Sequence, residues 1–203
     1  SQSNALTTET INTIQDYRTS AYELRYVYQQ RNPQNILVPL KRFFEVRLSK
    51  ATRKTTETKT NQTVYTLNAS NVFSLNLKNS VYVRLNAQGI NSESYLQNEL
   101  LRFGGINAIR GFEENSISAT QFGILASEYR YQLSPTLYMH SIIDAAYFKT
   151  PIQSDQKLFG FGFGFGLLTE AGLLKFNLAN GKTETQSFKF SDSKVHLSLT
   201  ATF

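Results

Sequence analysis

The sequence predicts an all-β protein, an antiparallel transmembrane β-barrel of which about nine strands lie in this chain. Three observations support this fold class. Apolar and polar residues alternate over short segments, the charges inside those segments avoid the apolar face, and the connectors alternate between short and long. A soluble β-sandwich alternates in the same way, so the pattern by itself leaves both architectures open.

The amino-acid composition argues against several classes of protein and of binding site. The chain has 203 residues, 40% of them hydrophobic, with a mean hydropathy of −0.32 and no apolar run near the length of a transmembrane helix. Cysteine is absent, which excludes disulfides, and two lone histidines favour neither a metal site nor a cofactor. The net charge of +6 is spread along the chain among acidic residues, which argues against a nucleic-acid partner.

The elements follow one another as alternating segments from residue 21 to the end, and residues 1–20 are expected to form a polar leader or loop. One break in alternation is predicted near Ser70–Asn71. The expected strands are Ala21–Gln30, Arg42–Lys50, Gln62–Leu77, Ser80–Gly89, Ala119–Leu133, Leu137–Phe148, Lys157–Leu168, Gly172–Asn180 and Lys194–Phe203.

The connectors differ in length at the two ends of the expected strands. This is typical of up-and-down outer-membrane barrels, which have tight turns at one end and long polar loops at the other. The short connectors are Lys78–Asn79, Ser134–Thr136 and Thr169–Ala171. The long connectors are Ala51–Asn61, Ile90–Ser118, Lys149–Gln156 and Gly181–Ser193.

Charge placement is consistent with a lipid-facing surface. In the first segment Tyr22, Leu24 and Tyr26 share one face, while Glu23 and Arg25 lie on the other. Nine charges lie in the middle of the expected strands, away from their ends, and all nine avoid the apolar face. One Lys or Arg facing lipid at mid-depth would cost about 2–4 kcal/mol. The pattern therefore indicates an apolar exterior and a polar interior.

The last segment favours the barrel over the sandwich. It is expected to be a strand whose apolar residues share one face, and it finishes on an aromatic residue. This resembles the terminal assembly signal of bacterial outer-membrane barrels. The residues of this signal are Val195, Leu197, Leu199 and Phe203.

The longest connector contains "LRFGGINAIRGFEEN", Leu101–Asn115. Five expected strands follow it. This stretch resembles the loop-six signature of the BamA/TamA outer-membrane insertase superfamily, which two-partner-secretion transporters share. The resemblance implies that the loop, residues 90–118, folds into the barrel lumen. The motif residues are Phe103, Gly104, Gly105, Ile109, Arg110, Gly111 and Phe112.

Two acidic residues are candidates to receive Arg110. A three-residue turn after Leu133 would place Glu128 diagonal to Asp144 on adjacent strands, about 7–8 Å apart, which one guanidinium can bridge. In the resembled family the loop arginine docks on acids from these same two strands. The alternative is that each acid pairs with a strand neighbour such as Arg130.

The segment "LFGFGFGFG", Leu158–Gly166, could be a low-complexity tract, an aggregation-prone segment or a strand with one bulky and one empty face. We favour the strand, with its phenylalanines facing lipid and its glycines giving the loop backbone room to approach. The glycines are Gly160, Gly162, Gly164 and Gly166. Two features depart from the family: this strand has no inward arginine, and Ser198 stands where the terminal signal commonly has glycine.

The resemblance implies a non-enzymatic function in the outer membrane of a Gram-negative bacterium. The chain would be the C-terminal part of a sixteen-stranded barrel that inserts or translocates unfolded proteins at a seam beside Lys194–Phe203. Its partners would be outer-membrane lipids, unfolded outer-membrane or secreted proteins, periplasmic POTRA domains and lipoproteins. The alternatives are the barrel of a patatin-like lipase fusion and a passive pore or adhesin. A phospholipase-like pair, His196 and Ser198, is also present but faces inward by parity.

Overall fold

The computed structural model describes residues 16–32, 37, 40–153, 156–184 and 189–201. Over these ranges the protein is built from β-strands and two short 3₁₀ turns, without an α-helix. No helix in the described part of the chain is long and apolar enough to cross a membrane. The predicted all-β, antiparallel class is confirmed.

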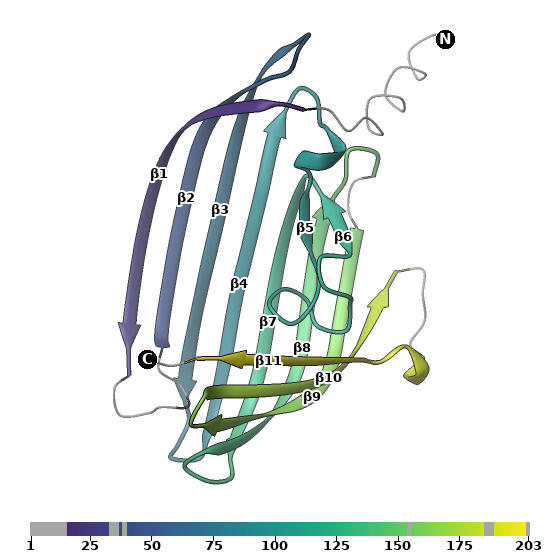
Figure 1. The fold of residues 1–203 in the computed structure, drawn as a ribbon. Coiled ribbons are helices and arrows are strands. Elements are labelled where there is room, and N and C mark those ends of the chain that lie inside the picture. Colours follow the sequence, from purple (N-terminus) through teal and green to yellow (C-terminus); the bar gives the residue numbers. More distant parts are fainter. Residues whose placement is uncertain (1–15, 33–36, 38–39, 154–155, 185–188, 202–203) are drawn as a thin grey trace.

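Nine strands form one up-and-down sheet in which each strand pairs with the next in antiparallel orientation (Figure 1). The sheet curves, and its two edges are β1 and β11, which do not pair with each other within the described ranges. In order, the strands are β1 (Arg18–Arg31), β2 (Leu40–Lys54), β3 (Lys59–Ser74), β4 (Asn79–Ser92), β7 (Gln121–Gln132), β8 (Leu137–Lys149), β9 (Gln156–Thr169), β10 (Gly172–Thr183) and β11 (Lys194–Thr200).

The connection between β4 and β7 contains the remaining structure. It holds the 3₁₀ turn η2 (Gln97–Glu99) and a hairpin of β5 (Leu101–Phe103) with β6 (Ile117–Ala119). Figure 1 shows this connection folded on the concave side of the sheet. A second 3₁₀ turn, η3 (Phe190–Asp192), precedes β11.

Several features of the strands differ from the sequence prediction. β1 begins at Arg18, within the segment expected to be a leader or loop. The expected long connector 51–61 is a turn of residues 55–58, because its polar Thr, Arg and Lys residues continue the β2–β3 pairing. The register of β3 runs through Ser70–Asn71 on both sides, so the predicted break there is wrong. Alternation is a weak guide where both faces of a strand are polar.

The two faces of the sheet have opposite character. Apolar side chains such as Tyr26, Phe163 and Leu199 are exposed on the outer face, whereas Glu45 and Asp144 are buried on the inner face. This arrangement is the reverse of a soluble β-sandwich, whose apolar face is the buried one. The predicted parity of the strands is therefore present in the structure.

Candidate functional site

The β4–β7 connection is held on the inner face by apolar packing. Phe103 stacks on Phe122 of β7 with ring centroids 4.6 Å apart and meets Phe148 of β8 edge-on at 5.4 Å. Ile109 is completely buried in the same cluster, together with Leu158 of β9. Phe103 and Ile109, both predicted motif residues, thus fix the loop against β7, β8 and β9.

The motif glycines have backbone conformations that other residues adopt only with strain. Gly104, Gly105 and Gly111 have φ values of 121°, 89° and 90°. Gly111 is also confined by space, because a Cβ there would collide with the backbone of Asn180 and Gly181 on β10. The chain can turn Arg110 toward the sheet only because glycine follows it.

Arg110 lies at the centre of a buried ion-pair cluster. Its Nε donates to Asp144 Oδ2 at 2.8 Å and its Nη2 donates to Asp144 Oδ1 at 2.5 Å. Its Nη1 donates to Glu128 Oε1 at 2.5 Å, and its backbone N–H donates to Asp144 Oδ2 at 3.0 Å. The side chains of Arg110 and Asp144 are 3% and 0% exposed. The structure therefore brings together the three residues that the sequence proposed as partners.

The strand register explains why both acids reach one guanidinium. Ala126 pairs with Asp144, so Glu128 lies two residues farther along β7 on the same face. Burial opposes the charge of Arg110, but the hydrogen bonds that it donates to Asp144 and the charge of Glu128 raise its pKa above the ordinary value for arginine. Two carboxylates and one guanidinium, all hydrogen-bonded, are the arrangement that makes a buried charge tolerable.

Arg130 joins the cluster as a second partner of Glu128. Its Nε and Nη2 each lie 2.7 Å from Glu128 Oε2, while Arg110 occupies Oε1. The guanidinium of Arg130 stacks over the ring of Tyr82 at 4.4 Å. Glu128 therefore pairs both with the loop arginine, as the family resemblance implies, and with its strand neighbour Arg130, as the alternative proposed.

The glycine-rich strand accommodates the loop at one of its four glycines. A Cβ on Gly160 would collide with the backbone carbonyl of Arg110. At Gly162 a Cβ would instead meet the backbone of β10, at Gly164 it would meet Asn177 and His140, and at Gly166 it would meet the ring of Tyr138. The expectation that all four glycines serve the loop is therefore corrected: three of them make room within the sheet itself.

A further glycine that approaches the loop was missed by the sequence analysis. Gly181 of β10 lies where a Cβ would meet the carbonyl of Gly111 and the ring of Phe112. The sequence predicts a connector that starts at Gly181, whereas β10 continues to Thr183. Its role could have been predicted from alternation, because Gly181 lies on the same inward face of the strand as Asn177 and Ala179.

The loop also contacts the last strand, which is an edge of the sheet. The backbone N–H of Gly111 donates to His196 Nε2 at 3.1 Å. Lys194 Nζ lies 2.8 Å from Glu113 Oε1 at an exposed position, and the Lys194 ammonium lowers the pKa of Glu113. The His196 imidazole is thus engaged with the loop on the inner face.

The apolar side chains of the terminal signal, Val195, Leu197 and Leu199, are exposed on the outer face of β11. Phe203 lies outside the described residues.

A second buried arginine anchors the start of the loop. Arg53 of β2 contacts Glu99 Oε1 at 2.6 Å and Ser94 Oγ at 2.7 Å. Glu99 Oε1 also accepts the N–H of Leu96 at 2.9 Å, and Glu99 Oε2 accepts from Gln62 at 3.0 Å. This pair is not predicted from the sequence, because Arg53 falls in the stretch 51–61 whose polar residues predict a connector.

Within the described residues, no group of three or more His, Cys, Asp or Glu side chains is arranged to hold a metal ion. No known protein-family model matches the chain, and no curated protein is significantly similar to it.

Proposed function

We propose that this chain is the C-terminal part of a sixteen-stranded outer-membrane β-barrel that inserts or translocates unfolded proteins, as in the BamA/TamA superfamily. The observation that carries the proposal is the Arg110 cluster. A glycine-flanked arginine from the longest loop reaches one acid on each of the next two strands, Glu128 and Asp144. These are the positions that the family resemblance assigned to the loop arginine and its partners.

The surface of the sheet supports a membrane location. Its outer face exposes Tyr, Leu, Ile and Phe side chains on β1, β2, β7, β8, β9 and β11. An extended apolar surface of this kind would promote aggregation in water, whereas a transmembrane β-barrel needs such a surface to face lipid. The buried arginines and carboxylates on the other face fit a polar interior. We therefore propose the outer membrane of a Gram-negative bacterium as the location, with outer-membrane lipids as direct partners.

The two free edges support a protein-handling function. In lipid an unpaired strand edge is costly, because its backbone N–H and C=O groups have no water to bond. β11 has seven residues and pairs with β10 on one side, and the loop contacts its inner face through His196. We propose that incoming substrate strands pair with the free edge of β11, lowering the barrier to their insertion. Periplasmic POTRA domains and lipoproteins would deliver these substrates.

The test is site-specific photocrosslinking in the complete protein. A photoreactive residue at Leu199 of β11 is compared with one at Ile143 of β8, because both side chains face outward and are exposed to 57% and 58%. We expect an unfolded outer-membrane protein arrested during assembly to crosslink at Leu199 and not at Ile143. Equal crosslinking at both positions, or none at either, would exclude a substrate seam at β11.

The alternatives make different predictions in the same experiment. A passive pore or adhesin barrel has no substrate strand, so neither position would crosslink to an assembly intermediate. The barrel of a patatin-like lipase fusion would crosslink only to its own upstream domain as that domain crosses the membrane. The crosslinked product, identified by mass spectrometry, separates these functions.

A further inference from the structure

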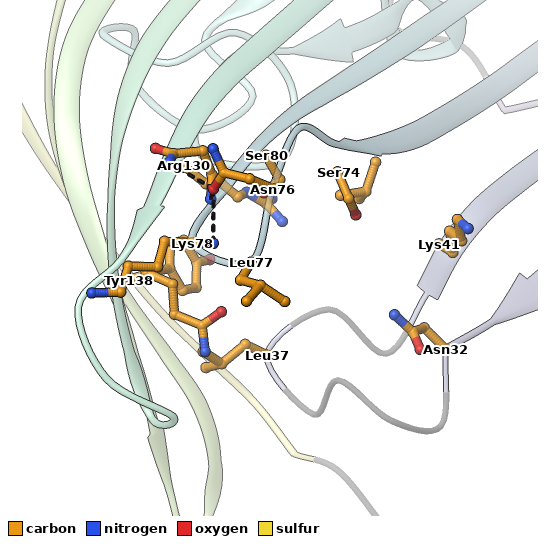
Figure 2. A pocket seen from close by; sticks show the side chains of 13 residues that line it. Asn32, Leu37, Lys41, Ser74, Asn76, Leu77, Lys78, Ser80, Arg130 and Tyr138 are labelled. Carbon is orange, nitrogen blue, oxygen red and sulfur yellow. Dashed lines mark hydrogen bonds between the residues drawn. The ribbon is translucent and has the colours of Figure 1, made fainter.

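A small cavity lies on the inner face at the end of the sheet that holds the β3–β4 and β7–β8 turns, and none of the described residues that line it is acidic. Its volume is about 60 Å³. Since an enclosed water needs about 10–15 Å³ of such space, the cavity has room for several waters or one tetrahedral oxyanion. Figure 2 shows the side chains around it, which come from Asn32 and Leu37 between β1 and β2, from β2, β3 and β4, from the β3–β4 turn, and from β7 and β8.

Three cationic side chains line the cavity. Arg130 and Lys78 lie on one side, and Lys41 lies across from them on β2 (Figure 2). Arg130 is paired with Glu128 through Nε and Nη2, whereas its Nη1 takes no part in those contacts. Neither lysine forms an ion pair with any described residue. Two ammonium groups therefore remain without a counter-charge beside one buried guanidinium.

The hydroxyl of Tyr138 is a second and independent feature of the cavity that points to a ligand with hydrogen-bond acceptors. Tyr138 is 2% exposed, lines the cavity, and its Oη has no hydrogen-bond partner in the described part of the structure. Buried hydroxyls are normally hydrogen-bonded, because leaving one unpaired is destabilising. The ring itself is fixed by Leu37 and Leu173, which form an apolar cluster with it. The ring is thus held in place at the cavity wall, and its hydroxyl forms no hydrogen bond with any described residue.

We propose that this cavity binds a phosphate group. The ammonium groups and the Tyr138 hydroxyl supply donors, and an acceptor-rich dianion would satisfy the hydroxyl and balance the two unpaired charges together. The phosphate can belong to free phosphate or to the headgroup of a phospholipid, because the cavity lies at the end of strands that we place in a membrane. The phosphate site rests on the cavity alone and does not depend on the insertion function.

Titration of the complete protein in detergent with inorganic phosphate, followed by calorimetry, tests the site. Tyr138→Phe and Lys78→Gln are each expected to weaken binding about tenfold, the effect of losing one hydrogen bond to a charged group. Lys59→Gln is the matched control, because Lys59 is an exposed lysine at the opposite end of β3. The melting temperature of Tyr138→Phe without phosphate should equal or exceed that of wild type, since its hydroxyl has no partner to lose.

Two further arms identify the source of the phosphate. Glycerol 3-phosphate serves as a soluble headgroup, and vesicles of phosphatidylglycerol are compared with vesicles of phosphatidylcholine. Binding of inorganic phosphate with the expected variant order supports a free-phosphate site, and binding confined to phosphatidylglycerol with the same order supports a headgroup site. The proposal is overturned if no phosphate compound binds wild type, if Tyr138→Phe binds like wild type, or if Lys59→Gln weakens binding as much as Lys78→Gln.

Discussion

Replacing Arg110 with methionine tests whether the buried ion pairs hold the loop on the sheet. Methionine keeps the length and apolar stem of the side chain but removes its charge and its donors. Asp144, 1% exposed, would lose its bonds from Nε and Nη2 and keep only the backbone N–H of residue 110. Glu128 would keep Arg130, so the uncompensated charge falls on Asp144.

Breaking a buried ion pair by removing one partner costs about 3–5 kcal/mol. Because about 1.4 kcal/mol corresponds to a factor of ten, loop opening should become more frequent by two orders of magnitude or more. Amide hydrogen exchange over residues 103–112 measures this opening directly. The double variant Arg110→Met/Asp144→Asn should exchange more slowly than the single variant, because it no longer buries an unpaired carboxylate.

The control is Arg102→Met, which removes an exposed arginine from β5 of the same loop and should leave exchange unchanged. Exchange in Arg110→Met within about threefold of wild type would refute the reasoning, since a buried pair of this geometry predicts far more. A double variant that exchanges faster than the single variant would also refute it. That result would mean that the carboxylate of Asp144 stabilises the loop without the guanidinium.

Three further outcomes are expected. Gly160→Ala should lower the melting temperature by overpacking, at a cost of about 1–3 kcal/mol, whereas Gly123→Ala, which has open space around its Cβ position, should not. Arg53→Met should expose the start of the loop to protease, because it leaves a buried carboxylate unpaired, and Lys54→Met should have no such effect because Lys54 is exposed. His196→Ala should speed amide exchange in β11 about tenfold or less by removing one neutral hydrogen bond, and unchanged exchange would show that the loop contact does not hold this edge.

The features predicted correctly from the sequence depend on local rules. Alternation with a period of two fixes which residues share a face, so the inward parity of Glu128 and Asp144 followed from their own strands. The relative position of the two acids followed from the length of one tight turn, residues 134–136, which sets the β7–β8 register. Where a short turn joins two strands, local sequence therefore predicts a contact across them.

The features that were missed involve residues far apart in the sequence. Arg53 and Glu99 are separated by two strands and a loop, and no turn fixes their relative position. The role of the four β9 glycines depends on how sharply the sheet bends and on which side chains approach from the neighbouring strands. The alternating glycines show that one face of β9 has no side chains. They do not show which neighbouring backbone or side-chain atoms pack against that face.

Three consecutive loop residues contact a large part of the sheet. Residues 110–112 reach β7 and β8 through ion pairs, β9 and β10 through close approach at two glycines, and β11 through His196. Five consecutive strands are thus in contact with three residues of the loop. Because close-packed contacts of this kind tolerate little displacement, the curvature of the sheet from β7 to its edge and the seating of Arg110 depend on each other. A change that frees Arg110 should therefore alter β11, the edge proposed to receive substrate strands, although the Arg110 side chain forms no hydrogen bond or ion pair with that strand.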